Sequence, residues 1–155
     1  MKNLKDIIQE RLHINKDTGN QHYNYRPKTK DELKQLVYKL IIERGYDADL
    51  NDIDTSEITD MSYMFNGSYF NGDISEWDVS NVKYMSYMLS NSSFTGENGD
   101  IFNWDVSNVE DMDYMFYYSE FNGDISNWDV KKVKTMKDIF NLSPLEKNPP
   151  KWYTK

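Results

Sequence analysis

Aspartate supplies most of the residues that could do chemistry, and the aspartates recur along the chain instead of gathering in one cluster. The stretch from Asp47 begins like a calcium loop, D-x-D-x-N, but its sixth position is Asp52 instead of Gly and its twelfth is Ile58 instead of Glu. His13 and His22 lack the spacing of metal ligands and are interpreted as surface residues. No Cys is present to act as ligand or nucleophile. We therefore expect no metal and no cofactor.

Catalytic patterns are missing as well. No glycine-rich phosphate loop, Ser/His/Asp arrangement or pair of catalytic carboxylates stands out, and an enzyme needs one asymmetric constellation. We therefore expect a protein that is not an enzyme and that has no catalytic residues.

Charge is distributed unevenly along the chain. Residues 50–130 carry Lys83 alone against sixteen acidic residues, whereas residues 131–155 carry seven Lys against two acids. The acidic body argues against direct binding of nucleic-acid phosphates. We expect a protein partner, for which a basic surface would be complementary, and no run of apolar residues is long enough to predict a membrane span. The sequence leaves the oligomeric state open.

A repeat of about 24 residues explains why the acids recur. Three segments align without gaps, DISEWDVSNVKYMSYML, DIFNWDVSNVEDMDYMF and DISNWDVKKVKTMKDIF, and Trp77, Trp104 and Trp128 mark them. Counting 24 residues back from Trp77 reaches Ile53 and a fourth copy that begins at Leu50. The aligned apolar positions have the spacing of a leucine-rich repeat, and they are Leu50/Ile74/Ile101/Ile125, Ile53/Trp77/Trp104/Trp128, Thr55/Val79/Val106/Val130 and Ile58/Val82/Val109/Val133.

The change of period within each copy predicts its elements. Alternating apolar residues predict a short strand, and Val82, Met85, Met88 and Leu89 lie on one face of a short helix after it. We therefore predict the α/β class, with a short leucine-rich-repeat-like solenoid of four strand-turn-helix repeats over residues 50–73, 74–100, 101–124 and 125–145.

Both ends of such a stack need a cover. Residues 1–49 are predicted to form a helical N-terminal capping segment, with one helix in LKDIIQERLHI and a second that starts at the capping box of Thr29 and Glu32 and ends at Gly45. Residues 146–155 are predicted to be a C-terminal tail, in which Trp152 and Tyr153 cover the other end.

Two groups of repeated side chains are candidates for a binding surface. The first lies between the buried strand positions and comprises Asp54, Asp78, Asp105 and Asp129 together with Glu76, Asn103 and Asn127. Either these residues form an acidic stripe for a partner, or each Asp bonds a neighbouring backbone amide or hydroxyl as part of a turn. The second group is a tyrosine-rich helix edge, which either contacts a partner or packs between helices, and it comprises Tyr63, Tyr87, Tyr114, Tyr117 and Tyr118.

The pattern WDVSNV-x-x-M-x-x-MF followed by FNGD resembles the BspA-like leucine-rich-repeat family of bacterial surface proteins over about residues 50 to 145. This resemblance implies an adhesion or interaction repeat that is not an enzyme. The helical N-terminal segment without a leader looks like the one found in phage and mobile-element forms. The sequence as printed therefore predicts a cytoplasmic protein of the host cell, or an extracellular surface protein if a leader has been removed.

Three functions fit these features. The first is a protein-protein interaction module that uses the acidic strand face, the tyrosine-rich helix edge or both. The second is a phage or mobile-element inhibitor of a host defence or nucleic-acid enzyme, with an acidic surface that imitates DNA. The third is a structural component of a particle or surface layer.

Overall fold

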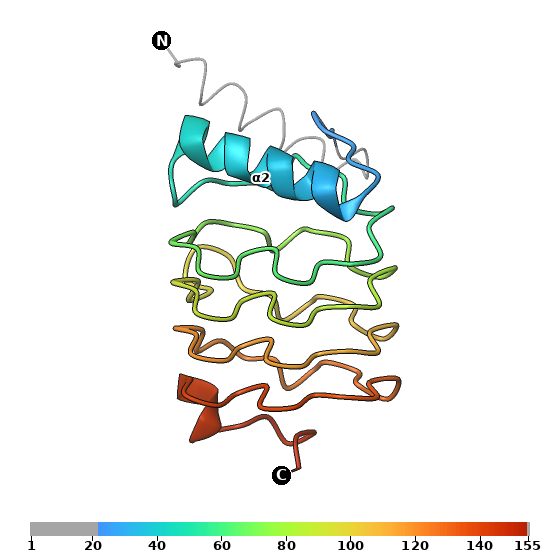
Figure 1. Ribbon diagram of the computed structural model, residues 1–155, viewed down its shortest axis with the longest axis vertical. Coiled ribbons are helices and arrows are strands. Elements are labelled where there is room, and N and C mark those ends of the chain that lie inside the picture. The colour runs from blue at the N-terminus through green and yellow to red at the C-terminus, as the bar shows by residue number, and fades with distance from the viewer. Residues whose placement is uncertain (1–21, 155) are drawn as a thin grey trace.

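The computed structural model describes residues 22–154, so the predicted helix in LKDIIQERLHI lies outside the described residues. Two helices are present in this range, α2 (Lys30–Arg44) and the short 3-10 helix η1 (Pro144–Glu146). Between them the chain winds through a stack of irregular coils, with α2 across one end and the C-terminal tail at the other (Figure 1). We call the segments 50–73, 74–100, 101–124 and 125–145 the first to fourth coils.

Helix α2 begins and ends where its capping residues predict. The Thr29 hydroxyl accepts a hydrogen bond from the Glu32 amide at 3.2 Å, and the Glu32 carboxylate accepts one from the Lys28 amide at 2.8 Å. At the other end Gly45 has φ 96° and donates its amide to Ile41. Leu33, Val37 and Leu40 are buried, since their spacing of four and three residues places them on one helix face. This face joins the hydrophobic core and closes the first coil.

The predicted class and repeat architecture are wrong. Residues 22–154 contain no extended strand, and the only helical residues within the coils are those of η1 at the end of the fourth coil, so there is no leucine-rich-repeat-like solenoid of four strand-turn-helix repeats. In place of a sheet, the described residues show isolated parallel bridges, which pair Tyr25 with Ile53, Asp49 with Asp73, Asp60 with Tyr84, Tyr84 with Asp111, and Asp111 with Thr135.

Local turns replace the predicted strands. The Trp77 amide donates to the Ile74 carbonyl at 3.1 Å, and the Val82 amide donates to the Val79 carbonyl at 2.9 Å. Bonds between residues three apart bend the backbone, whereas a strand would leave these groups free for its neighbours. The apolar side chains still face inward, because successive turns return them to the same side.

The predicted helices fail for a related reason. A helix over residues 82–89 would need its amides for internal bonds, but Met85 and Tyr87 donate theirs to Asp111 and Asp113 of the next coil, each at 2.9 Å. Tyr87 also has φ 55°, a left-handed conformation that ends any right-handed helix. The backbone therefore bonds between coils where a helix would bond within itself.

Tryptophan side chains fix the register of the stack. Each indole Nε1 donates to the carbonyl of an aliphatic residue one coil earlier: Trp77 to Leu50 at 3.0 Å, Trp104 to Ile74 at 3.2 Å, and Trp128 to Ile101 at 3.0 Å. The three tryptophans are at most 4 % exposed, so the bonds lie inside the core. A shift of one residue would leave these buried donors unpaired.

The C-terminal tail continues this register. Trp152 lies 24 residues after Trp128 and donates its Nε1 to the Ile125 carbonyl at 2.8 Å, as the earlier tryptophans do. Trp152 and Tyr153 also pack against Phe140, with ring centroids 5.9 and 5.1 Å away. The tail thereby covers part of the core at the end of the stack opposite α2 (Figure 1).

Three additional residues in the second coil form a small loop at one corner. Around this loop the Thr95 amide donates to the Asn71 side-chain oxygen at 2.9 Å, and the Asn98 side-chain amide donates to the Asn71 backbone oxygen at 2.6 Å. Gly96, with φ 85°, makes the turn. The hydrogen bonds between coils on either side of the loop keep their register.

Candidate interaction surface

Tyr63, Tyr87 and Tyr114 stack on one another along one edge of the coils, and we call these three residues the tyrosine ladder. The ring centroids of Tyr63 and Tyr87 are 4.8 Å apart at an interplanar angle of 6°, and those of Tyr87 and Tyr114 are 4.7 Å apart at 15°. Tyr63 is 44 % exposed and the other two are partly exposed. The three rings therefore present their edges to solvent as one strip.

A lysine lies over each end of the tyrosine ladder. Lys30 Nζ is 5.7 Å from the centroid of the Tyr63 ring, and Lys137 Nζ is 5.8 Å from that of Tyr114. The hydrogen bond and charge of Tyr114 raise the pKa of Lys137 above its usual value. These cation–π contacts close both faces of the stacked rings. The sequence pattern does not reveal the contact of Lys30, because this residue lies in α2 and no repeat position marks it.

The ladder tyrosines have an uncommon backbone conformation. Their φ values are 63°, 55° and 55°, in the left-handed region that Gly, Asn and Asp adopt most easily. At the corresponding position of the fourth coil the residue is Asp138, with φ 49°. The backbone therefore accepts Asp at this position, and the tyrosines must be explained by their side chains.

Tyr117 and Tyr118 extend the aromatic surface in the third coil. Tyr117 meets Tyr114 edge to face, with ring centroids 5.7 Å apart, and is partly exposed. Tyr118 is 60 % exposed and has φ 51°, although the corresponding residues of the first two coils are Gly67 and Asn91. Tyr118 thus replaces residues suited to this backbone with an exposed ring.

The aspartates of the predicted acidic stripe each accept a hydrogen bond from the residue two positions on. Asp78 Oδ1 accepts both the amide and the hydroxyl of Ser80, and Asp105 Oδ1 does the same with Ser107. Asp54 and Asp129 accept only the amides of Ser56 and Lys131. These are Asx turns, in which the side chain substitutes for a backbone acceptor.

The same bonds keep the carboxylates charged. The hydroxyl and amide of Ser107 hold the pKa of Asp105 below its usual value, and those of Ser126 do the same for Asp124. Each turn bond uses Oδ1, and Asp78, Asp105 and Asp129 are themselves exposed. A turn role and an acidic surface are therefore compatible.

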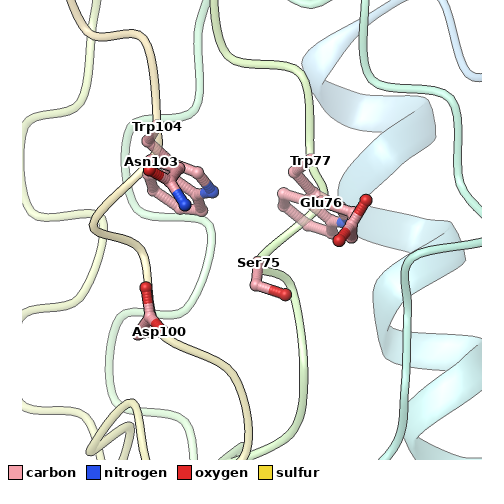
Figure 2. Close-up of a pocket in the computed structure, with 6 residues that line it drawn as sticks. All are labelled: Ser75, Glu76, Trp77, Asp100, Asn103 and Trp104. Atoms are coloured by element: carbon pink, nitrogen blue, oxygen red, sulfur yellow. The ribbon is translucent and has the colours of Figure 1, made fainter.

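The remaining candidates, Glu76, Asn103 and Asn127, are all exposed. Figure 2 shows Glu76 and Asn103 beside a cavity of about 380 Å³ between the second and third coils, which Ser75, Asp100 and the two tryptophans also line. Trp77 and Trp104 are only 3 % and 4 % exposed and cannot offer a ring face to a ligand. Asn127, on the fourth coil, is not part of this cavity.

Neither a metal-binding cluster nor a membrane-spanning helix is found in the part of the chain that the structure describes. Between residues 22 and 154 no group of three or more His, Asp or Glu side chains could hold a metal ion. No helix in that range is long and apolar enough to cross a membrane.

These observations define a protein of repeated, turn-built coils with an aromatic ladder on one edge. The chain belongs to the family described as "Mycoplasma protein of unknown function, DUF285", which matches residues 32–152. This match includes α2 from Glu32 onward, all four coils and the tail as far as Trp152. No curated protein and no solved structure matches the chain.

Proposed function

We propose that this chain is a non-enzymatic protein-binding module and that the tyrosine ladder is its contact surface. The observation that carries the proposal is the left-handed backbone at three tyrosines in successive coils, of which Tyr63 is exposed and the other two are partly exposed. Such a conformation costs an ordinary residue about 1 kcal/mol, which Asn or Asp would largely avoid. Stacking returns a similar amount for each ring pair, so folding alone gains little from tyrosine at these positions.

Tyrosine suits a contact surface because it offers a large area with few rotatable bonds. The rings of the ladder are already fixed by stacking and by Lys30 and Lys137, so binding would order little further. Tyr117 and Tyr118 enlarge the same surface within the third coil. The proposed interface therefore runs along one edge of the stack and needs no change of fold.

The resemblance to BspA-like surface proteins supports the same class of function. From it we propose an adhesion or interaction role, in a short form like those of phages and mobile elements. We propose that the chain acts in the host cell cytoplasm, or at the cell surface if a leader precedes it.

A second proposal is that the acidic rows bind a basic partner or imitate DNA in an inhibitor. The observation in its favour is that Asp78, Asp105 and Asp129 are exposed at the same position of successive coils. Against it, the turn bonds of Asp78 and Asp105 already explain why Asp recurs at these positions. We therefore rank it below the tyrosine ladder.

A capture experiment with native host proteins separates the two surfaces. In one variant Tyr63→Asn, Tyr87→Asn and Tyr114→Asn are combined, since Asn tolerates the left-handed backbone. The matched control is Asp138→Asn, at the same position of the fourth coil. A second variant combines Asp78→Asn, Asp105→Asn and Asp129→Asn, which removes charge but keeps an oxygen for each turn.

We expect captured proteins to be lost from the tyrosine variant and kept by both Asn-for-Asp variants. Capture should also survive moderate salt, because an aromatic interface depends little on screening. If a tyrosine variant with wild-type circular dichroism keeps its partners while the aspartate variant loses them, the acidic surface is the correct one. Both proposals would be contradicted if no captured protein were lost on substitution of the tyrosines or of the aspartates.

A further inference from the structure

The stack has a direction, because one row of amides in each coil donates toward the C-terminal end. The Met61, Met85 and Met112 amides donate to Tyr84, Asp111 and Thr135 of the following coil, each at 2.9 Å. The amides of Tyr63, Tyr87 and Tyr114 donate in the same way at 2.8–3.0 Å. The last coil in this direction therefore presents donors to whatever lies beyond it.

In the fourth coil the matching amides are those of Met136 and Asp138, and neither has an acceptor within residues 22–154. The Lys134 carbonyl, which follows the acceptors Thr59, Lys83 and Glu110 in its row, likewise receives no hydrogen bond in that range. We call the Met136 and Asp138 amides and the Lys134 carbonyl the amide edge. Their spacing of two residues matches one side of an extended chain.

An amide farther along this edge, two residues beyond Phe140, shows which chemical group such an amide accepts. In the first three coils Gly67, Asn91 and Tyr118 donate to a backbone carbonyl of the following coil. In the fourth coil Leu142 donates to the Glu146 carboxylate instead, at 3.0 Å. The Glu146 carboxylate thus takes the place that a backbone carbonyl of the following coil has in the earlier coils. Successive backbone amides attract such anionic groups.

The side chains around the amide edge also favour an anionic ligand, because most of the charged ones are lysines. Lys131, Lys132, Lys134 and Lys137 are all exposed, and Asp138 is the one acid between residues 131 and 145. Three of these ammonium groups contact the third coil, since Lys132 donates to Asn108, Lys134 donates to Glu110, and Lys137 lies over the Tyr114 ring. The aligned positions of the second coil hold Ser80, Asn81, Lys83 and Ser86. Three of the four lysines are therefore particular to the last coil.

Apolar surface is also left open at this end. Val133 and Met136 are partly exposed, although their counterparts Val82 and Met85 are completely buried. Leu142 is 56 % exposed. The tail covers Ile125 and Phe140 but leaves these residues accessible.

We propose that the amide edge binds an extended, acidic polypeptide segment of another protein, which adds to the stack as a further coil would. Backbone carbonyls of the segment would accept from Met136 and Asp138, its carboxylates would be attracted by the positive charge of the four lysines, and its apolar residues would cover Val133 and Leu142. A second copy of this chain does not fit, because two such edges would bring their lysines together and α2 covers the opposite end (Figure 1).

The test uses the full chain and a fluorescent decapeptide of alternating Val and Glu, with alternating Val and Lys as the control peptide. Anisotropy reports binding, and amide nitrogen–proton NMR spectra report which backbone groups take part. The variant combines Lys131→Ser, Lys132→Asn and Lys137→Ser, the residues of the second coil. Lys28→Ser, Lys34→Ser and Lys39→Ser remove the same charge near the other end.

We expect the acidic peptide alone to bind, with downfield shifts at the Met136 and Asp138 amides. The fourth-coil variant should weaken binding about tenfold while the control variant does not. Binding without shifts at these two amides, or no binding at low salt, would overturn the proposal. Self-association of the fourth-coil variant, with no peptide binding by the wild type, would also overturn it and show that the lysines keep two copies apart.

Discussion

The tryptophan Nε1 hydrogen bonds from each coil to the one before it form a row that we call the indole ladder. Replacing Trp104 by Phe tests whether this ladder holds the coils together. The substitution removes the hydrogen bond from Nε1 to the Ile74 carbonyl and leaves a gap in a core where Trp104 is 4 % exposed. The Ile74 carbonyl keeps a second hydrogen bond, from the Trp77 amide at 3.1 Å, so it is not left unsatisfied. We therefore assign about 1 kcal/mol to the lost bond and about 2 kcal/mol to lost packing.

Trp152→Phe is the matched control, because it removes the equivalent bond to Ile125 from a residue that is only partly buried. Its cost should be close to that of the bond alone, about 1 kcal/mol. Urea unfolding, followed by tryptophan fluorescence and circular dichroism, gives both free energies of unfolding. A three-to-one ratio between Trp104→Phe and Trp152→Phe would separate packing from hydrogen bonding.

Equal costs for the two substitutions would refute this reasoning, since burial would then have no influence. A cost below about 0.5 kcal/mol for Trp104→Phe would show that the indole bond does not set the register. A change in the denaturant dependence of the transition, in contrast, would mean that the variant no longer unfolds in one step.

Two further predictions concern the first coil. Gly72→Ala should lower the free energy of unfolding in urea by about 3 kcal/mol, because a Cβ would lie 2.0 Å from the Ala48 backbone oxygen. Gly67→Ala should lower it by about 1 kcal/mol, because the space around Gly67 is open but its φ is 68°. Equal losses for the two substitutions would contradict the clash at Gly72. Burial alone would raise the pKa of Asp52, but its bonds to Arg44 and Asn24 and the charge of Arg44 hold it below the usual value. The ion pair therefore stabilises the fold above about pH 4 and is lost as pH falls through the lowered pKa. Asp52→Asn should cost about 3 kcal/mol at neutral pH and much less in strong acid, and an equal cost at both pH values would exclude the ion pair.

The sequence predicted inward-facing positions better than backbone conformation. Trp77, Val82 and Met85 are buried as their spacing indicates, because apolar periodicity records the direction of side chains. The same directions can be produced by a strand and helix or by successive turns, so the periodicity could not distinguish them. Tyr87, in a left-handed conformation, gave no signal at all, because tyrosine is not a residue expected there.

For the candidate residues, too, the repeat indicated which positions are accessible but not the backbone conformation around them. The aspartates and tyrosines do recur at exposed or partly exposed positions, as the repeat indicates. The Asx turns of Asp78 and Asp105 could have been predicted more firmly from the spacing D-x-S. The 24-residue interval from Trp128 to Trp152 was also visible and would have assigned the tail to the indole ladder. The amide edge, however, depends on backbone direction and has no counterpart in the sequence pattern.

The loop at Thr95–Asn98 shows where this architecture can vary in length. Its additional residues bond back to Asn71 and leave the tryptophan and tyrosine contacts on both sides intact. Insertions could therefore lengthen or change this corner while the indole bonds keep each coil in place. Register and loop length would then evolve separately, so the surface at this corner could change without a change of fold.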